Sequence, residues 1–261
     1  MVKKVRRLKA KPGKARGRRA LDLRREFREA VGRNKVDFQV RGMLGADDRV
    51  FPLGTDTKVL STVFELFVRP LIQEIAKAYG YQVEEAPQTI YPDFTLLRTP
   101  EGKDKIAVDV KTTYRRPEIV FTLGSYTSFL RNNTKNILYP YDHYVAHWIL
   151  GFVYSRTRDV PTEIHAFQAR EKIIAPYRDV EWFAQEKYKI AGERPGSGNT
   201  ANIGSIRSAN IAEFVDGRGP FAELGEKAFR DYWANFGRDR DDRRYTTVGE
   251  YLEWKRGATR R

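Results

Sequence analysis

An amphipathic helix pattern followed by three strand-like runs limits this chain to few fold classes. Between Asp56 and Tyr79 apolar side chains recur every three or four residues, as on one helix face, at Leu60, Val63, Phe64, Phe67, Leu71 and Ile75. Asp56 or Thr57 would cap the start of this helix, and Pro70 would kink it or split it in two. Strand-like runs follow at 92–98, 105–113 and 147–154, with a candidate helix over 127–136. This alternation predicts an α/β fold.

The chain is strongly basic, but the excess is concentrated at one end. Its 261 residues include 48 Lys and Arg against 34 Asp and Glu, for a formal net charge of +14. Ten of these basic residues lie within positions 1–20, which hold no acid, so the rest of the chain carries +14 − 10 = +4. The excess indicates a nucleic acid or an anionic membrane surface as partner, with solubility alone as the alternative. We expect residues 1–20 to form a disordered tail that contacts phosphates, and 21–261 to form one domain.

Several classes of protein are excluded by what the sequence lacks. Cysteine is absent, which excludes disulfides, thiolate metal sites and a Cys nucleophile and fits a cytoplasmic protein. No apolar run reaches the roughly 18 residues of a membrane span, and no apolar segment of a secretory signal follows the basic N-terminus. His143 and His147 are four residues apart but lack the glutamate of a His-Glu-x-x-His zinc motif, so we interpret them as structural.

Charged residues interrupt two of the strand-like runs, at Asp93, Asp109 and Lys111. A strand over 105–113 would place Ile106, Val108 and Val110 on one face and Ala107, Asp109 and Lys111 on the other. A turn at residues 100–102 would centre a hairpin near residue 101 and set Asp93 opposite Asp109. Directly opposed side chains have Cβ atoms roughly 4.5–5.5 Å apart. The two carboxylates would therefore face each other.

Such a pair needs a compensating charge. Two carboxylates about 5 Å apart repel by roughly 3 kcal/mol at an effective dielectric constant of about 20. A proton on one acid would offset this, but a divalent cation such as magnesium, which prefers carboxylate oxygens, fits better. Lys111 lies on the same face, where it could meet an anionic substrate. An exposed polar strand face is the alternative.

The same residues, with four longer segments, resemble EcoRV-like type II restriction endonucleases of the PD-(D/E)xK nuclease superfamily. Pro92 and Asp93 are followed, after fifteen residues, by Asp109, Val110 and Lys111. The segments are PLGTDTKVLSTVFELFVRP (52–70), FTLGSYTSFLRNNTKNILYP (121–140), HYVAHWILGFVYSR (143–156) and AGERPGSGNTANIGSI (191–206). The resemblance covers about 50–154 and 187–206. It implies a restriction-endonuclease-like core, a mixed β-sheet flanked by helices.

The resemblance implies roles for the acidic cluster. Asp93 and Asp109 would bind Mg²⁺, joined by the Val110 carbonyl, and Lys111 would stabilise charge on the reacting phosphate or orient the attacking water. Glu65, beside the apolar stripe of the first helix, would be a third acid that serves a second metal or positions water; a surface glutamate is the alternative. A metal-activated water would attack the DNA phosphodiester and leave 3′-hydroxyl and 5′-phosphate ends.

The resemblance also implies which residues contact DNA. Residues at about 193–204 resemble the major-groove recognition loop, where glycine permits close approach and Asn can pair with adenine. Its members are Gly196, Ser197, Gly198, Asn199, Thr200 and Asn202. Ala201 stands where the family has a second Thr, and Arg207 where it has His. Gln88 would belong to a minor-groove loop that is one residue shorter here.

The remaining DNA contacts would be to the backbone. Thr113 and Tyr114 follow the catalytic strand, and Thr127, Ser128 and Lys135 would hold phosphates. The hydroxyls of Thr127 and Ser128 could instead cap a helix.

The implied enzyme is a homodimer that cuts palindromic double-stranded DNA, with the target 5′-GATATC-3′ cleaved bluntly at its centre. Its host would need a cognate DNA methyltransferase. A PD-(D/E)xK nuclease of DNA repair or branched DNA would explain the acids but not GSGNTANIGS. A non-catalytic DNA-binding protein would explain the charge but not the opposed aspartates.

Overall fold

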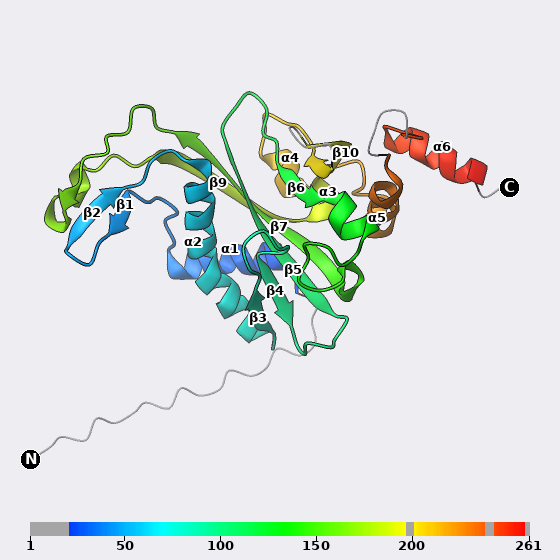
Figure 1. Ribbon diagram of the computed structural model, residues 1–261, viewed down its shortest axis with the longest axis horizontal. Coiled ribbons are helices and arrows are strands. Elements are labelled where there is room, and N and C mark those ends of the chain that lie inside the picture. Colours follow the sequence, from blue (N-terminus) through cyan, green and yellow to red (C-terminus); the bar gives the residue numbers. More distant parts are fainter. Residues whose placement is uncertain (1–20, 197–200, 238–242, 259–261) are drawn as a thin grey trace, which may run out of the picture.

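The chain is built around a five-stranded mixed sheet, seen in the computed structural model, which describes residues 21–196, 201–237 and 243–258 (Figure 1). The strand order is β3-β4-β5-β7-β9. Only β5 and β7 are parallel, and the other neighbours are antiparallel. The bounds are β3 (Gln82–Glu85), β4 (Phe94–Leu97), β5 (Lys105–Tyr114), β7 (Tyr144–Arg156) and β9 (Tyr177–Glu186). This sheet, flanked by helices, confirms the predicted α/β class.

Two three-stranded sheets extend the structure. One has the order β1-β2-β8 and the other β10-β11-β6. The first is formed by β1 (Gly42–Leu44), β2 (Arg49–Pro52) and β8 (His165–Ala166). The second is formed by β6 (Thr122–Ser125), β10 (Ala191–Pro195) and β11 (Asn202–Ser205). The predicted loop at about 193–204 therefore has strands at both of its ends.

Helices pack on both faces of the central sheet, so β7 is buried on both sides. Leu150 and Phe152 join the cluster formed with α1 (Leu23–Asn34) and α2 (Thr57–Ala78). Ile149 and Val153 join the cluster on the other face. The helices of that cluster are α3 (Lys187–Ile190), α4 (Ala212–Asp216), α5 (Gly225–Asn235) and α6 (Val248–Ala258). Short turns η1 (Thr127–Arg131), η2 (Tyr141–His143) and η3 (Phe167–Lys172) connect these elements.

Helix α2 begins where the sequence predicts. The Asp56 carboxylate accepts the backbone N–H groups of Lys58 (2.8 Å) and Val59 (3.2 Å), which caps the helix. The helix continues through Pro70 to Ala78, so of the two predicted alternatives, a kink or a split at Pro70, the split is wrong. Seven buried side chains hold this helix on the sheet, and their burial outweighs the one backbone hydrogen bond that proline removes.

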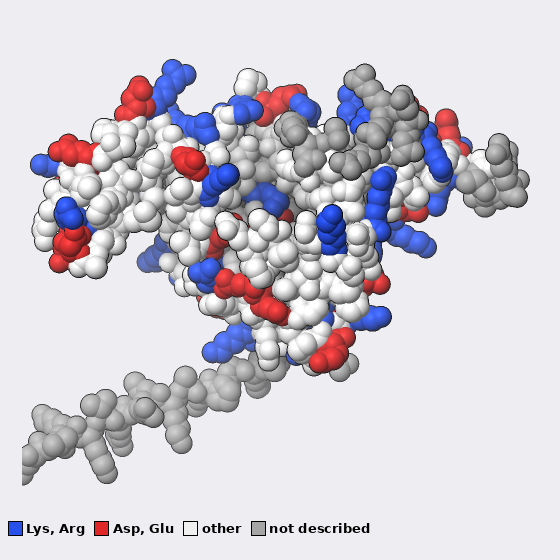
Figure 2. Space-filling view, in the orientation of Figure 1, with Lys and Arg blue, Asp and Glu red and all other residues white. Residues whose placement is uncertain are grey.

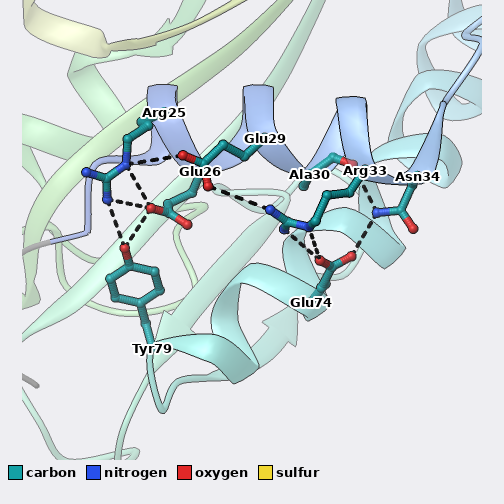
Figure 3. Close-up of polar contacts among 8 residues, drawn as sticks. All are labelled: Arg25, Glu26, Glu29, Ala30, Arg33, Asn34, Glu74 and Tyr79. Carbon is teal, nitrogen blue, oxygen red and sulfur yellow. Dashed lines mark hydrogen bonds and ion pairs between the residues drawn. The ribbon is translucent and has the colours of Figure 1, made fainter. Parts of the chain in front are cut away.

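Polar contacts fix α1 against the end of α2 (Figure 3). The Tyr79 hydroxyl donates to Glu26 (2.8 Å), a carboxylate buried in α1. At the other end of α1, Arg33 and Asn34 donate to Glu74 at 2.7 Å and 2.8 Å. The two helices thus form a supported unit, and α2 carries Glu65 toward the central sheet.

The helix predicted over 127–136 is shorter than expected. Only Thr127–Arg131 is helical, as a π-helical turn. Asn133 and Asn136 have φ values of 58° and 55°, a left-handed conformation that ends a right-handed helix. Within the described residues, no helix is both long and apolar enough to span a membrane.

Candidate active site

The hairpin of β4 and β5 has the register that the sequence predicts. Phe94 pairs with Val108 and Leu96 with Ile106, so paired residue numbers sum to twice 101. One step further, the same register sets Asp93 against Asp109. The side chains of β5 also alternate between the two faces of the sheet, as predicted. Val108 and Val110 pack into the cluster with α2, whereas Ala107 packs into a separate cluster on the opposite face.

The structure brings Asp93, Asp109 and Lys111 together at this end of the hairpin. Asp93 Oδ2 accepts the backbone N–H of Val110 at 2.6 Å, which fixes its carboxylate against β5. Asp109 is 2% exposed. Lys111 Nζ lies 2.5 Å from Asp109 Oδ2, and its side chain keeps 26% of its surface exposed. The ammonium group therefore holds a buried acid while it remains within reach of a substrate.

The electrostatics of this cluster reflect an excess of negative charge. Burial, followed by the charge of Asp109, raises the pKa of Asp93 to about 8, against the opposing effects of Lys111 and the Val110 N–H. Burial lowers the pKa of Lys111, but Asp109 and Asp93 outweigh it, so that this pKa lies above its usual value. Two acids share one ammonium group, and another positive charge would stabilise them.

Glu65 lies near enough to this cluster to interact electrostatically with its residues. It is half-buried on α2. Burial raises its pKa, Lys111 lowers it and Asp109 raises it. These electrostatic interactions with Lys111 and Asp109 indicate that Glu65 lies on the side of α2 near them.

The donor set fits a hard divalent cation. Asp93 and Asp109 offer carboxylate oxygens, and Val110, between Asp109 and Lys111, offers a backbone carbonyl. Magnesium is commonly held by one or two carboxylates and keeps several waters. Among the described residues, no group of three or more His, Cys, Asp or Glu side chains is arranged to hold a metal ion. The candidate metal ligands are thus the aspartate pair and the neighbouring carbonyl.

The second predicted region, the recognition segment, is anchored by strands. Gly196 N donates to Asn202 O at 2.9 Å where β10 and β11 approach. The Ala201 carbonyl accepts from Tyr126 N (3.0 Å) and from the Ser125 hydroxyl (3.2 Å). The other predicted members, Ser197, Gly198, Asn199 and Thr200, lie outside the described residues, as does the tail of residues 1–20.

Thr127 and Ser128 share this anchor. The Ser125 hydroxyl lies 2.9 Å from that of Thr127 and accepts the backbone N–H of Ser128 at 3.1 Å. The hydroxyl that caps this turn is therefore that of Ser125. The structure thus places residues 125–128 beside the recognition segment.

The other predicted DNA contacts lie on separate elements. Thr113 and Tyr114 are half-buried at the end of β5. Gln88 is exposed in the turn between β3 and β4, and Lys135 is exposed after η1. All four remain candidates for contacts along a duplex.

Of the two histidines predicted to be structural, His143 and His147, the second is 2% exposed and its Nδ1 lies 2.8 Å from the Tyr91 hydroxyl. Next to it is Lys187, which the sequence did not single out. Lys187 is fully buried, and its Nζ lies 4.5 Å from the ring centroid of Tyr91 and 5.3 Å from that of Phe129. Burial lowers the pKa of Lys187 to about 8, opposed by the charge of Asp109. No local signal marks this lysine, because the aromatic rings come from distant segments.

Comparisons with known proteins identify the family of this chain. The family described as restriction endonuclease EcoRV matches residues 34–256. The type II restriction enzyme EcoRV of Escherichia coli is 47% identical over 243 residues, which cover 90% of this chain and 98% of that relative. Among solved structures, the NlaIV restriction endonuclease is similar at 12% identity and a TM-score of 0.40, over 82% of this chain and 87% of that chain. By its sequence, this chain belongs to the EcoRV family of type II restriction endonucleases, which are deoxyribonucleases.

Proposed function

We propose that this enzyme cleaves double-stranded DNA at the palindrome 5′-GATATC-3′, bluntly and with magnesium as cofactor. The observation that carries the proposal is the cluster of Asp93, Asp109 and Lys111, in which the half-buried Asp93 bonds to the Val110 N–H and the buried Asp109 pairs with the Lys111 ammonium group. A structural ion pair would need one acid, whereas the pKa of the second, Asp93, is raised to about 8 beside Asp109, and a bound metal would favour its charged form.

Each residue of the cluster has a role in the proposed hydrolysis. Asp93, Asp109 and the Val110 carbonyl would hold Mg²⁺, which when bound lowers the pKa of a coordinated water and neutralises phosphate charge. Lys111 would direct its ammonium group at the scissile phosphate, where charge develops as water attacks in line. The P–O3′ bond breaks, leaving a 3′-hydroxyl and a 5′-phosphate. Glu65 would position water or serve a second metal ion.

The proposed target follows from the recognition segment. The Ala201 carbonyl accepts the Tyr126 N–H and the Ser125 hydroxyl, so the alanine in place of the family's threonine keeps this anchor. Arg207 is exposed and lies 3.4 Å from Glu118. Asn199, Thr200 and Asn202 would read the major groove and Gln88 the minor groove. Backbone contacts would come from Thr113, Tyr114, Thr127, Ser128 and Lys135.

We also infer a two-fold dimer, because a palindrome presents the same half-site twice. The sheet of β1, β2 and β8 supports this inference with exposed apolar side chains. Met43 is 59% exposed, Leu44 57%, and the neighbouring Ile164 and Phe167 43% and 40%. Exposed apolar side chains are frequent at protein–protein interfaces. The enzyme would act in the cytoplasm, beside a methyltransferase that protects the host's own sites.

Digestion of a plasmid of known sequence, with magnesium and with EDTA, tests the proposal. We expect discrete, metal-dependent bands whose blunt ends map to 5′-GATATC-3′. Smears or structure-selective cuts would instead indicate a repair nuclease, and no cutting would indicate a DNA-binding protein. Bands that map to another sequence would contradict the proposed target while leaving the proposed chemistry in place.

A further inference from the structure

A groove of about 1130 Å³ lies where β5 and β7 end and β9 begins, beyond the proposed catalytic cluster. Because β5 and β7 are parallel and β9 is antiparallel to β7, all three reach the same edge of the sheet. The charge of its lining is strongly positive. Four arginines contribute to the lining against a single acid: Arg115, Arg156, Arg158 and Arg178 against Asp159.

Two of these arginines already have acidic partners. Arg115 pairs with Glu181, and Arg178 pairs with Asp179 at 2.8 Å. Across the described parts of the chain, Arg156 and Arg158 form no ion pair with a carboxylate. Both are exposed. These two residues therefore supply the uncompensated charge of the groove.

Stacking holds one of these guanidinium groups in place. The Arg156 guanidinium carbon lies 3.8 Å from the ring centroid of Tyr114, and that of Arg116 lies 4.2 Å from the same ring. Two guanidinium groups therefore stack on the ring of Tyr114. An arginine stacked on an aromatic ring loses less side-chain freedom when it binds a phosphate.

The groove is continuous with the recognition segment. A neighbouring cavity of about 410 Å³ shares Tyr114 with the groove and is also lined by Arg116 and Arg207. A third cavity of about 610 Å³ shares Arg207 and reaches Gly196. Figure 2 shows basic side chains, with acidic ones among them, along the upper edge, where Figure 1 places the loop after β5 and the end of β7. A row of cavities therefore leads from the recognition segment to the groove, and the largest excess of arginine over acid along it is in the groove itself.

The length of β5 separates the groove from the catalytic cluster. From Asp109 to Tyr114 the strand advances five residues, about 16 Å at roughly 3.3 Å per residue. At about 3.4 Å per base pair, this corresponds to about five base pairs of duplex. The centre of a hexanucleotide lies three base pairs from its end. The groove would therefore lie farther from the cleavage point than the end of the target sequence does.

We propose that this groove binds the phosphate backbone of duplex DNA that flanks the recognition sequence, through Arg156 and Arg158. The inference rests on the proposed function, which places the scissile phosphate at Asp93 and Asp109. Flanking backbone contacts add affinity without reading bases, and their strength depends on salt because each neutralised phosphate releases counterions.

The test compares Arg156→Gln/Arg158→Gln with a control pair, Arg28→Gln/Lys77→Gln, which removes equal charge from exposed positions on α1 and α2. Binding is measured with an Asp109→Ala background, to prevent cleavage, on duplexes of about 30 and about 8 base pairs that contain one central target, so that the short duplex ends before the groove. On the long duplex we expect the groove variant to bind about tenfold more weakly, with a salt slope reduced by about two per subunit. The control pair should match the parent.

An equal loss on both duplexes, or no loss on the long one, would overturn the inference. Thermal unfolding of each variant verifies that it is folded. Plasmid cleavage by the wild type separates the two proposals. If the wild type does not cut, the proposed function fails; if it cuts and the groove variant binds long DNA normally, only the groove assignment fails.

Discussion

Two acids that share one lysine give this chain its candidate chemistry at the scale of single residues. Asp93 bonds to the Val110 N–H and Asp109 pairs with Lys111, so both carboxylates have fixed positions before any metal or DNA arrives. The sequence predicted their meeting because only two local features are needed, the alternation along one strand and a turn that fixes the hairpin's centre. Both features involve residues close together in the chain, so they can be recognised in a single sequence.

Lys187 shows where that information ends. Its segment, EKYKI, has the composition of an exposed helix end, yet the lysine is fully buried. The rings of Tyr91, Phe129 and Tyr141 that surround it come from three distant positions in the chain. A tertiary cage of this kind leaves no periodic pattern, so no reading of one segment could predict it.

The buried lysine leads to a prediction about stability and pH. The pKa of Lys187 is about 8 when folded and has the ordinary value of 10.5 when unfolded. Between these values the unfolded chain binds more protons, so this group makes the free energy of unfolding rise with pH. The rise should be of order 3 kcal/mol. Denaturant unfolding from pH 8 to pH 10.5 should show a smaller rise for Lys187→Met than for wild type.

The control for this prediction is Lys77→Met, which removes an exposed lysine at the end of α2. It should leave the pH dependence of wild type unchanged. If Lys187→Met keeps the full rise, the buried lysine is not its source.

At the scale of elements, local periodicity separates what was predicted from what was not. Helix α2 and the hairpin of β4 and β5 follow patterns of adjacent side chains, and both were predicted closely. The helix expected over 127–136 ends early because Asn133 and Asn136 adopt left-handed conformations, which the sequence permits but does not require. The strands β10 and β11 were interpreted as loop because glycines mask their pattern.

A glycine in β11 allows the main chain of that strand to approach that of β10 closely. A Cβ at Gly204 would lie 2.6 Å from the Arg194 carbonyl oxygen and 3.2 Å from Gly196 N, both main-chain atoms that cannot rotate away. We expect Gly204→Ala to open the hairpin and destabilise the protein by about 1–3 kcal/mol. Specific cleavage should fall more than nonspecific DNA binding does. Thermal unfolding and cleavage of a single-site duplex measure the two effects.

Gly32→Ala is the matched control on α1. A Cβ there meets no atom within 4 Å, so this change should stabilise the helix by about 0.5–1 kcal/mol. Equal behaviour of the two alanine variants would show that close approach at Gly204 is not required.

At the scale of the whole molecule, charge and apolar surface are unevenly distributed. The uncompensated arginines, Arg156 and Arg158, lie in the groove at the edge of the central sheet, whereas exposed apolar side chains occur on and beside the sheet of β1, β2 and β8. Exposure depends on how distant segments pack, so neither surface could be predicted from composition. The sequence predicted a polyanionic partner and, by resemblance, a dimer, but not where either would bind.

The apolar surface leads to a prediction about assembly. Met43→Glu/Leu44→Glu would place charges in the proposed interface, and we expect it to weaken the dimer by more than about tenfold. Sedimentation should then find mainly monomers, and the variant should lose double-strand cleavage. Val145→Glu is the control, because Val145 is 63% exposed on β7, outside that sheet. A dimer that resists the double change but not the control would contradict the proposed interface.

The most direct measurement is single-turnover cleavage of a duplex with one central 5′-GATATC-3′, by wild type and by Asp109→Ala, with DNA binding followed in parallel. We predict two blunt products from the wild type with magnesium and none with EDTA. Asp109→Ala should cleave at least about a hundredfold more slowly while it still binds the duplex. Equal cleavage rates for the two proteins would contradict the assignment of Asp109, and with it the proposed active site.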